Sequence, residues 1–340
     1  MQYLITGGAG FIGSNYAFRL LERGEQVILY DNLSRPGVQR NLDWLRQHFG
    51  EHAFELVIGD VRDAALLTAV ARRADVIVHL AGQVAVTTSV ARPREDFEAN
   101  ALGTFNALEA ARLSERDPIF LYASTNKVYG GMEEVAVIEK ETRWDYRDLP
   151  FGCPETQPLD FHSPYGCSKG SGDQYVRDYA RIYGLRSVVF RQSCIYGPRQ
   201  FGLEDQGWVA WFVIAAITGR PITIYGDGKQ VRDVLFVEDL LDAYDQAILH
   251  IEQARGQVYN IGGGAQNTIS IWREFGPLLE KWLGHPIPVR YGDWRPGDQR
   301  VFYADIRKAA RELGWEPRVG VEEGIRRLID WVQKHRFYFE

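Results

Sequence analysis

The chain has 340 residues, 45% of them hydrophobic, and a formal net charge of −6 at pH 7. A chain of this length can bury a substantial core in one large domain or two smaller ones. The acidic balance argues against a nucleic-acid partner. No apolar stretch is long enough to span a bilayer, and the amino end runs directly into an expected strand. We therefore expect neither a membrane partner nor a signal peptide.

The three cysteines bear on the compartment and on metal chemistry. Cys153, Cys167 and Cys194 follow no metal-ligand spacing, and an odd number cannot all pair. We therefore expect reduced thiols in a cytoplasmic protein and no metal site.

An apolar strand expected at residues 3–6 runs into a glycine-rich turn, and a helix follows at once. In such a turn Gly7 permits a sharp bend, Gly10 lets the backbone approach phosphates, and Gly13 lets the helix pack on the strand. The helix N-terminus adds unpaired N–H groups and a partial positive charge. This order predicts a dinucleotide site that extends to Phe11 and Ile12.

The second strand, expected at residues 26–30, ends at Asp31. A carboxylate here can accept hydrogen bonds from both ribose hydroxyls of adenosine, and it would repel a 2′-phosphate. We therefore expect NAD rather than NADP as the cofactor, with Asp31 and Asn32 in its site. Two alternatives stay open: Arg35 could accommodate a 2′-phosphate, and Asp31 could instead serve as a cap or turn residue.

Strand-like runs alternate with helical patterns through the first half. The strands are expected at residues 3–6, 26–30, 54–58, 76–80, 119–123 and 187–191. Helical stretches such as residues 62–73 and 100–112 lie between them. This rhythm predicts an α/β fold of the Rossmann type, a doubly wound parallel sheet with helices on both faces. Ligands on such a sheet bind beyond the carboxyl ends of the strands.

After about residue 195 the rhythm loosens, and turn-rich pieces interrupt shorter elements. We expect residues 1–190 to form the dinucleotide-binding domain. Residues 191–340 should form a smaller cap that closes a cleft over the sheet and is partly interwoven with the first domain.

Tyr165 and Lys169 stand four residues apart in a helical segment that starts near Pro164, so they share one helix face. An ammonium beside a phenol lowers the pKa of the phenol and favours the phenolate, a base able to take a proton from a sugar hydroxyl. The spacing is also common in purely structural helices, but here it follows a dinucleotide pattern. We therefore expect a catalytic Tyr165, with Lys169 as its partner and as a contact of the nicotinamide ribose.

With these residues, the chain resembles the extended short-chain dehydrogenase/reductase family over nearly its full length. The landmark stretches are residues 6–13, 59–61, 79–83, 100–104, 165–169 and 196–198. The family modifies nucleotide sugars, so the resemblance implies a nucleotide-sugar substrate, bound NAD and a homodimer or homotetramer. It also implies further cofactor contacts: Asp60 and Val61 near adenine, Leu80, Ala81 and Gly82 over the cofactor, and Asn100 near the catalytic strand. Asn100 could equally be a backbone cap.

The third catalytic group of the family is a Ser or Thr before a Val-Tyr-Gly-like turn, and residues 123–130 read Ala-Ser-Thr-Asn-Lys-Val-Tyr-Gly. By resemblance, Thr125 bonds the reacting sugar oxygen and Ser124 touches the cofactor. The similar sugar 4,6-dehydratases carry Asp and Glu at the next two positions, an acid and a base that eliminate water. Asn126 and Lys127 stand there in this chain. We therefore expect reversible hydride exchange with NAD, which is epimerisation.

Longer stretches resemble one subgroup, the CDP-tyvelose (CDP-paratose) 2-epimerases. They are residues 124–130, 159–169, 205–209 and 228–235. Cys194 stands where the 4-epimerases of the family usually have Asn, which is consistent with chemistry at C2. The resemblance implies interconversion of CDP-paratose and CDP-tyvelose through a 2-keto intermediate. A UDP-sugar 4-epimerase and a non-catalytic NAD-binding regulator stay open as alternatives.

At the nucleotide end, Arg232 and Arg295 match family arginines that clamp the diphosphate, a task that suits guanidinium forks. Gln206 and Trp208 begin the segment that usually contacts the base and the phosphates, so we include both in the substrate site. Each arginine could instead form a surface ion pair with a nearby aspartate, and Trp208 could instead belong to the core.

Overall fold

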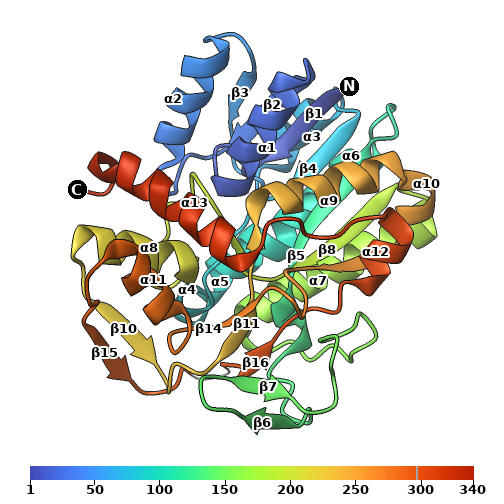
Figure 1. Cartoon of the computed structure of the whole chain (residues 1–340). Coiled ribbons are helices and arrows are strands. Elements are labelled where there is room, and N and C mark those ends of the chain that lie inside the picture. Colours follow the sequence, from blue (N-terminus) through green and yellow to red (C-terminus); the bar gives the residue numbers. More distant parts are fainter. Residues whose placement is uncertain (296–297) are drawn as a thin grey trace.

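In the computed structural model, which describes residues 1–295 and 298–340, a seven-stranded parallel sheet runs through the larger lobe (Figure 1). From edge to edge, its strands are β13 (Val258–Ile261), β8 (Ser187–Gln192), β5 (Ile119–Thr125), β4 (Val76–His79), β1 (Gln2–Thr6), β2 (Gln26–Asp31) and β3 (Glu55–Ile58). Every neighbouring pair is parallel. The predicted α/β fold is confirmed.

Helices cover both faces of this sheet. One layer, with α1 and α9 in front of the sheet in Figure 1, consists of α1 (Phe11–Glu22), α2 (Val38–Phe49), α9 (Val237–Leu249), α10 (Ile251–Ala254) and α12 (Arg307–Leu313). The opposite layer consists of α3 (Ala64–Ala71), α6 (Gly103–Arg112) and α7 (Ser163–Tyr183). Within β1, Tyr3 and Ile5 pack into the first layer and Leu4 into the second, because successive strand residues point to opposite faces.

The strand order reverses between β1 and β4. β2 and β3 continue on one side of β1, and β4, β5, β8 and β13 continue on the other. Such a reversal leaves a crevice at the carboxyl ends of the two central strands, where doubly wound sheets bind their ligands. Gly7 follows β1 at this point, and Leu80 follows β4.

The smaller lobe has its own core. It is built from short strands and helices: β9 (Ile195–Tyr196), α8 (Trp208–Thr218), β10 (Ile222–Tyr225), β11 (Val231–Asp233), β12 (Leu235–Phe236), β14 (Thr268–Ser270), α11 (Phe275–Leu283), β15 (Val289–Gly292), β16 (Val301–Phe302) and α13 (Val321–Lys334). Helix α8 is apolar almost all round, and its side chains are buried against α13 and α11. A hairpin of β6 (Val137–Glu139) and β7 (Trp144–Tyr146) extends below β16 in Figure 1.

The two halves of the chain interlock. The boundary predicted at residue 190 falls inside β8, and β13 from the second half forms one edge of the sheet. Helices α9 and α12, also from the second half, pack on the sheet in the same layer as α1. The division into two domains stays a prediction, but residues 191–340 contribute to the large lobe as well as to the cap.

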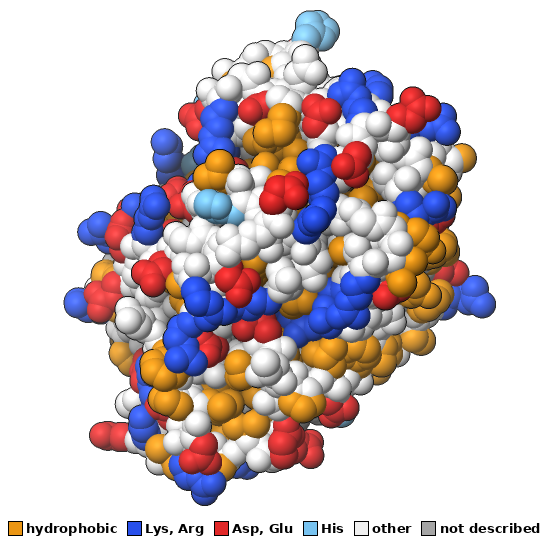
Figure 2. Space-filling view, turned by 90° about the vertical axis from the view of Figure 1, so that its right-hand side faces the viewer, with side chains coloured by type: hydrophobic (Ala, Val, Ile, Leu, Met, Phe, Trp, Pro, Cys, Tyr) orange, Lys and Arg blue, Asp and Glu red, His pale blue; other side chains and the backbone are white. Residues whose placement is uncertain are grey.

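Charged side chains of both signs are scattered among hydrophobic and other side chains over the face turned to the viewer in Figure 2. Within the described ranges, no helix combines the length and the apolar character that crossing a membrane requires.

Candidate active site

The turn after β1 requires glycine on steric grounds. Gly7 has a φ of +68°, in the left-handed region that favours glycine. A Cβ atom on Gly13 would lie 2.5 Å from the carbonyl oxygen of Gly7, and one on Gly7 would lie 2.9 Å from the backbone nitrogen of Ala81. Gly10 is followed directly by Phe11 and Ile12, the first residues of α1. The turn therefore brings a helix N-terminus to the crevice, which fits a pyrophosphate.

Asp31, the last residue of β2, is buried beside this turn. Its Oδ2 accepts a hydrogen bond from the N–H of Ala9 (3.0 Å), and its Oδ1 accepts one from the N–H of Leu33 (2.8 Å). Burial raises the pKa of Asp31, although both backbone bonds oppose that shift. Each carboxylate oxygen has a second lone pair, so the group retains acceptor capacity for ribose hydroxyls. The site fits NAD.

The other residues predicted on the adenine side gather at the ends of β2 and β3. Asn32 Nδ2 donates to Asp60 Oδ2 at 2.9 Å. Arg62 donates to both carboxylate oxygens of Asp60 and holds the pKa of that carboxyl well below its ordinary value. The carbonyl of Val61 accepts a hydrogen bond from Asn106. The structure therefore brings these predicted residues together, with the Asp60 carboxylate already paired.

The segment after β4 forms the opposite side of the crevice. Leu80 and Ala81 are hydrogen-bonded through their backbone nitrogens to the last residue of β1. A Cβ atom on Gly82 would collide with Oδ1 of Asn100, whose Nδ2 donates to Ser168 Oγ at 3.1 Å. Asn100 lies in η1 (Glu98–Leu102), a π-helical turn, and such turns are frequent at functional sites. Its side chain therefore joins this wall to the helix that carries Tyr165.

Tyr165 and Lys169 lie on α7, and Thr125 ends β5. Burial raises the pKa of Tyr165 to about 12, and the nearby Thr125 hydroxyl opposes that shift. The Lys169 ammonium lies 4.4 Å from the centroid of the Tyr122 ring, and burial lowers its pKa to about 8. The expectation that the Tyr165 pKa is lowered is therefore wrong for this structure, because the loss of water around the phenol dominates.

Ser124 has a partner that the sequence did not indicate. Its Oγ donates to Asp173 Oδ2 at 2.8 Å, and Asp173 forms a fully buried ion pair with Arg191 at 2.9 Å. Arg191 also donates to the Tyr129 hydroxyl at 3.0 Å. Because the hydroxyl proton of Ser124 is engaged, its predicted contact with the cofactor can use Oγ only as an acceptor.

The residues after Thr125 form a short 3-10 helix, η2 (Asn126–Tyr129), and Thr125 Oγ1 accepts a hydrogen bond from the N–H of Lys127. Burial lowers the pKa of Lys127, and the positive charge of Arg232 adds to this effect. Cys194 Sγ accepts a hydrogen bond from Trp208 Nε1 at 3.5 Å. Burial raises the pKa of that thiol, and the charge of Arg232 opposes the shift. The structure therefore brings Lys127, which follows Thr125 closely in the chain, near Arg232 and Cys194.

The residues predicted at the nucleotide end are held by other side chains. Arg232 donates to Asp298 at 2.7 Å, and the Arg295 guanidinium lies 4.0 Å from the centroid of the Tyr225 ring. Gln206 accepts a hydrogen bond from Arg35, the residue that raised the possibility of NADP. This bond ties the loop after β2 to the segment before α8.

Trp208 packs edge-on against Phe212 and Phe275, with ring centroids 5.8 and 5.3 Å apart. Its ring is only partly buried, so it belongs to the rim of the aromatic cluster of the smaller lobe. Its predicted contact with the substrate stays a prediction.

Two buried groups, Ser168 on α7 and Asp96 beside that helix, were missed from the sequence. Ser168 donates to Asp96 Oδ2 at 2.6 Å, and Gln83 donates to the other oxygen at 2.9 Å. Burial raises the pKa of Asp96. Ser168 is next to Lys169, so its position gave some signal. Asp96 lies in α5 (Pro93–Phe97) and carries no local signal, because only the folded chain brings it to α7.

Comparison with known proteins gives matches along nearly the whole chain. The sequence profile of the family described as GDP-mannose 4,6 dehydratase matches residues 4–328. The CDP-paratose 2-epimerase of Salmonella typhi is 47% identical over 98% of this chain and 99% of its own length. The structure of UDP-glucose 4-epimerase from Thermotoga maritima with UDP-glucose is 32% identical, with a TM-score of 0.84 over 99% of this chain and 100% of that one. UDP-glucose 4-epimerase from Thermus thermophilus in complex with NAD is 31% identical, with a TM-score of 0.80 over 98% and 99%.

Proposed function

Because this chain belongs to the extended short-chain dehydrogenase/reductase family of NAD-dependent epimerases and dehydratases, we propose that it interconverts CDP-paratose and CDP-tyvelose. The main observation that supports this reaction is the segment that starts at Thr125. Thr125 lies close to the Tyr165 hydroxyl, and the next two residues, Asn126 and Lys127, offer no carboxylic acid for eliminating water. The similarity to a CDP-paratose 2-epimerase supports the choice of substrate.

When bound, NAD supplies the hydride acceptor and, for the return step, the hydride donor. Tyr165 removes the proton of the sugar C2 hydroxyl, and Thr125 holds the oxygen that loses it. A Tyr165 phenol with a pKa of about 12 needs nearby positive charge to ionise near neutral pH. Lys169, one helical turn further on α7, is in a position to supply that charge.

The 2-keto form of the substrate must present its other face before hydride returns. The nucleotide end is the part that can stay anchored while the sugar turns. Arg232 is buried and oriented by Asp298, and Arg295 stacks on Tyr225, so both guanidinium groups are held in place before a diphosphate arrives. We propose that they clamp the diphosphate, with Gln206 and Trp208 at the base.

A UDP-sugar 4-epimerase is the second candidate, because solved UDP-glucose 4-epimerases share this fold along the full chain. The environment of Cys194 favours the 2-epimerase. At this position the 4-epimerases usually have an asparagine, which can both donate and accept hydrogen bonds. Here the thiol is engaged by the indole N–H of Trp208.

The proposal is tested by incubating the purified protein with CDP-paratose, UDP-glucose, GDP-mannose and dTDP-glucose, and identifying the products by NMR. We expect inversion at C2 of CDP-paratose and no loss of water from any substrate. Turnover of UDP-glucose to UDP-galactose, with no reaction of CDP-paratose, would establish the second candidate instead. The Tyr165→Phe variant serves as the control for contaminating enzymes.

We also propose a homodimer. Helices α6 and α7 expose aromatic and aliphatic side chains on adjacent turns, among them Phe105 (39% exposed), Tyr175 (50%) and Tyr183 (55%). Phe105 and Tyr175 contact each other edge-on across the two helices. Figure 2 shows hydrophobic side chains gathered along its right-hand edge. That edge is the back of the molecule in Figure 1, where α3, α6 and α7 cover the sheet. A contiguous apolar face of this kind typically marks an interface between subunits.

Sedimentation analysis tests the dimer. The wild type should sediment as a dimer, and Phe105→Glu/Tyr175→Glu should sediment as a monomer with unchanged secondary structure. A monomeric wild type would contradict this proposal. A cytoplasmic location, also proposed, agrees with three cysteines that are free thiols.

A further inference from the structure

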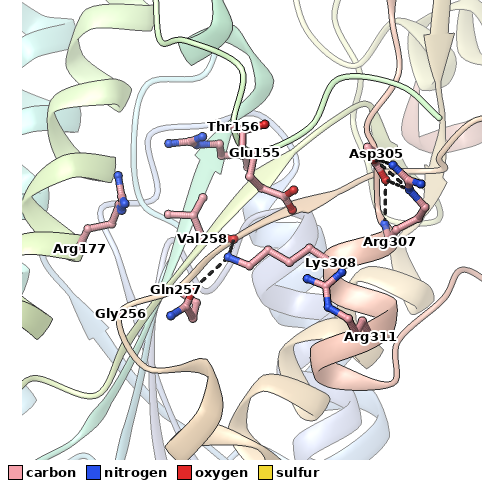
Figure 3. Close-up of a pocket in the computed structure, with 11 residues that line it drawn as sticks. Glu155, Thr156, Arg177, Gly256, Gln257, Val258, Asp305, Arg307, Lys308 and Arg311 are labelled. Atoms are coloured by element: carbon pink, nitrogen blue, oxygen red, sulfur yellow. Dashed lines mark hydrogen bonds and ion pairs between the residues drawn. The ribbon is translucent and has the colours of Figure 1, made fainter. Parts of the chain in front are cut away.

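A charged cavity lies at the β13 edge of the sheet, between α7 and α12. Its volume is about 630 Å³, and Figure 3 shows its lining side chains. Arg177 enters it from α7, Lys308 and Arg311 enter from α12, and Glu155 comes from the loop after β7. None of the residues assigned to the cofactor or the nucleotide sugar lines this cavity. It is therefore distinct from the candidate active site.

The lining carries more positive than negative charge. Five cationic and two carboxylate side chains face the cavity. Arg191 is paired with Asp173, Arg307 with Asp305 and Arg311 with Glu312, which lie on the cavity wall or just behind it. Two cations, Arg177 and Lys308, hydrogen-bond only to neutral groups and form no ion pair among the described residues, so neither charge is neutralised by direct contact.

The hydrogen bonds of these two cations show how each is held. Lys308 Nζ donates to Gln257 Oε1 and to the Val258 carbonyl, both at 2.9 Å, as drawn in Figure 3. Those bonds fix the ammonium at the cavity wall and leave its third proton free. Arg177 NH1 donates to Gln174 at 3.3 Å, and its Nε is buried with no hydrogen-bond partner in the described structure. A buried guanidinium N–H group normally donates to a hydrogen-bond acceptor, and this one has no acceptor within the protein as described.

We propose that this cavity is a second anion site, which binds a small phosphate-bearing molecule. Arg177 stands on α7 and Lys308 on α12, on either side of the cavity. A tetrahedral phosphate presents oxygens in several directions and can bridge both walls, whereas a planar carboxylate offers only two oxygens on one side. A volume of about 630 Å³ lies in the usual range for small-molecule ligands and is far larger than a single ion needs.

Glu155 shapes the specificity of this site. Its Oε1 accepts a hydrogen bond from the backbone N–H of Asn260 at 2.8 Å, which fixes the carboxylate among the cations. Burial raises the pKa of Glu155. A charged Glu155 weakens the binding of a bare anion but can accept hydrogen bonds from hydroxyl groups. The expected ligand is therefore a phosphate ester of a hydroxylated molecule, of which a nucleotide and a sugar phosphate are two sources.

The experiment is calorimetric titration of the NAD-bound protein with inorganic pyrophosphate, followed by CMP and glucose 1-phosphate to distinguish the two sources. Arg177→Met/Lys308→Met should weaken pyrophosphate binding at this site at least tenfold. Glu155→Gln should strengthen it severalfold, because a like charge is removed while the acceptor for Asn260 remains. Arg232→Met/Arg295→Met, altered only in the nucleotide-sugar cleft, should retain this binding event.

The thermal unfolding midpoint and the NAD content of each variant are measured to check that it is folded. If the double variant fails to fold, Arg311→Ser, whose parent side chain is 68% exposed, replaces it and should weaken binding severalfold. Unchanged pyrophosphate binding in the folded cavity variants would overturn the proposal. So would loss of all pyrophosphate binding in Arg232→Met/Arg295→Met. Neither result depends on the identity of the sugar substrate. A negative result for this cavity would therefore leave the proposed epimerase reaction unaffected.

Discussion

The N–H of Ala9 donates to Oδ2 of Asp31 at 3.0 Å, which joins the glycine turn after β1 to the end of β2. The same carboxylate accepts the N–H of Leu33 through its other oxygen. Asp31 therefore has a role within the protein in addition to its proposed contact with a ribose. It fixes the turn that we propose binds a pyrophosphate, and it keeps lone pairs for the adenosine hydroxyls.

Asp31→Asn should lower the amount of NAD that copurifies with the protein. Asparagine has one acceptor oxygen, so one of the two backbone N–H groups would face an NH2 group. Leaving a buried donor without a partner costs about 1–3 kcal/mol. Cofactor released on denaturation is measured by absorbance and chromatography, and Asp148→Asn on the surface is the control. We expect NAD and not NADP from the wild type; NADP in that extract would contradict the assigned role of Asp31.

Gly13→Ala should also deplete bound NAD, because the new Cβ atom would lie 2.5 Å from the Gly7 carbonyl oxygen and would displace the turn. Gly320→Ala is the matched control. Gly320 has a φ of −68°, and a Cβ atom there meets no neighbouring atom within 4 Å. The control should keep its NAD content and its thermal midpoint. Equal NAD content in both variants would count against the close fit of the turn.

Tyr165→Phe should reduce the rate of epimerisation by about 100- to 10,000-fold, the range typical of losing a general base. NAD should remain bound, since the glycine turn and Asp31 are untouched. Tyr146→Phe is the control, because the Tyr146 hydroxyl is also buried but donates to the Val301 carbonyl. Near-normal turnover of Tyr165→Phe, followed by NMR of the sugar C2 proton, would falsify the proposed chemistry.

His79 should make the protein less stable in mild acid. It is fully buried between Thr6 and Thr104, and burial lowers its pKa to about 3. Between that value and about 6.5, the unfolded chain binds a proton that the folded chain does not. The stabilising contribution is complete above pH 6.5 and is lost progressively as the pH falls toward 3.

Urea denaturation at pH 7 and pH 5 measures this loss. The wild type should lose about 2 kcal/mol more of its free energy of unfolding than His79→Gln over this interval. Glutamine offers a donor and an acceptor to the same threonines but does not titrate. An equal loss in both proteins would show that His79 is not the responsible group.

Arg232→Met should raise the KM for the nucleotide sugar about 10- to 100-fold, the loss expected for a hydrogen bond between charged groups. Its effect on kcat should be smaller, because Arg232 is assigned to the diphosphate and not to the reacting carbon. Initial rates at varied substrate concentration separate the two constants. Arg336→Met, at an exposed ion pair near the carboxyl end, is the control. A fall in kcat alone would contradict the clamp.

The sequence predicted the elements that depend on local pattern. Glycine spacing located the turn after β1, and the four-residue interval placed Tyr165 and Lys169 on one helix. It predicted the wrong direction for the Tyr165 pKa shift. That direction depends on how completely the folded chain excludes water from the phenol, which spacing does not report.

Contacts between distant segments were also beyond the sequence. Asp173 binds both Ser124 and Arg191, and Gln206 binds Arg35, yet no motif links these positions. The cavity between α7 and α12 is the extreme case, since its cations come from helices far apart in the chain. Such pairings follow from tertiary packing, for which a single sequence carries no local signal.

The edge position of β13 has a consequence for synthesis. Strand β8 pairs on one side with β5 and on the other with β13, which is synthesised only after the first half of the smaller lobe. Until then, β8 is an unpaired edge that can join other chains. The hydrogen bond from the Tyr129 hydroxyl to Asn260 of β13 also cannot form until β13 has been synthesised. The nascent chain should therefore depend on chaperones longest at this edge, and the segment beside Thr125 should gain its final support late in translation.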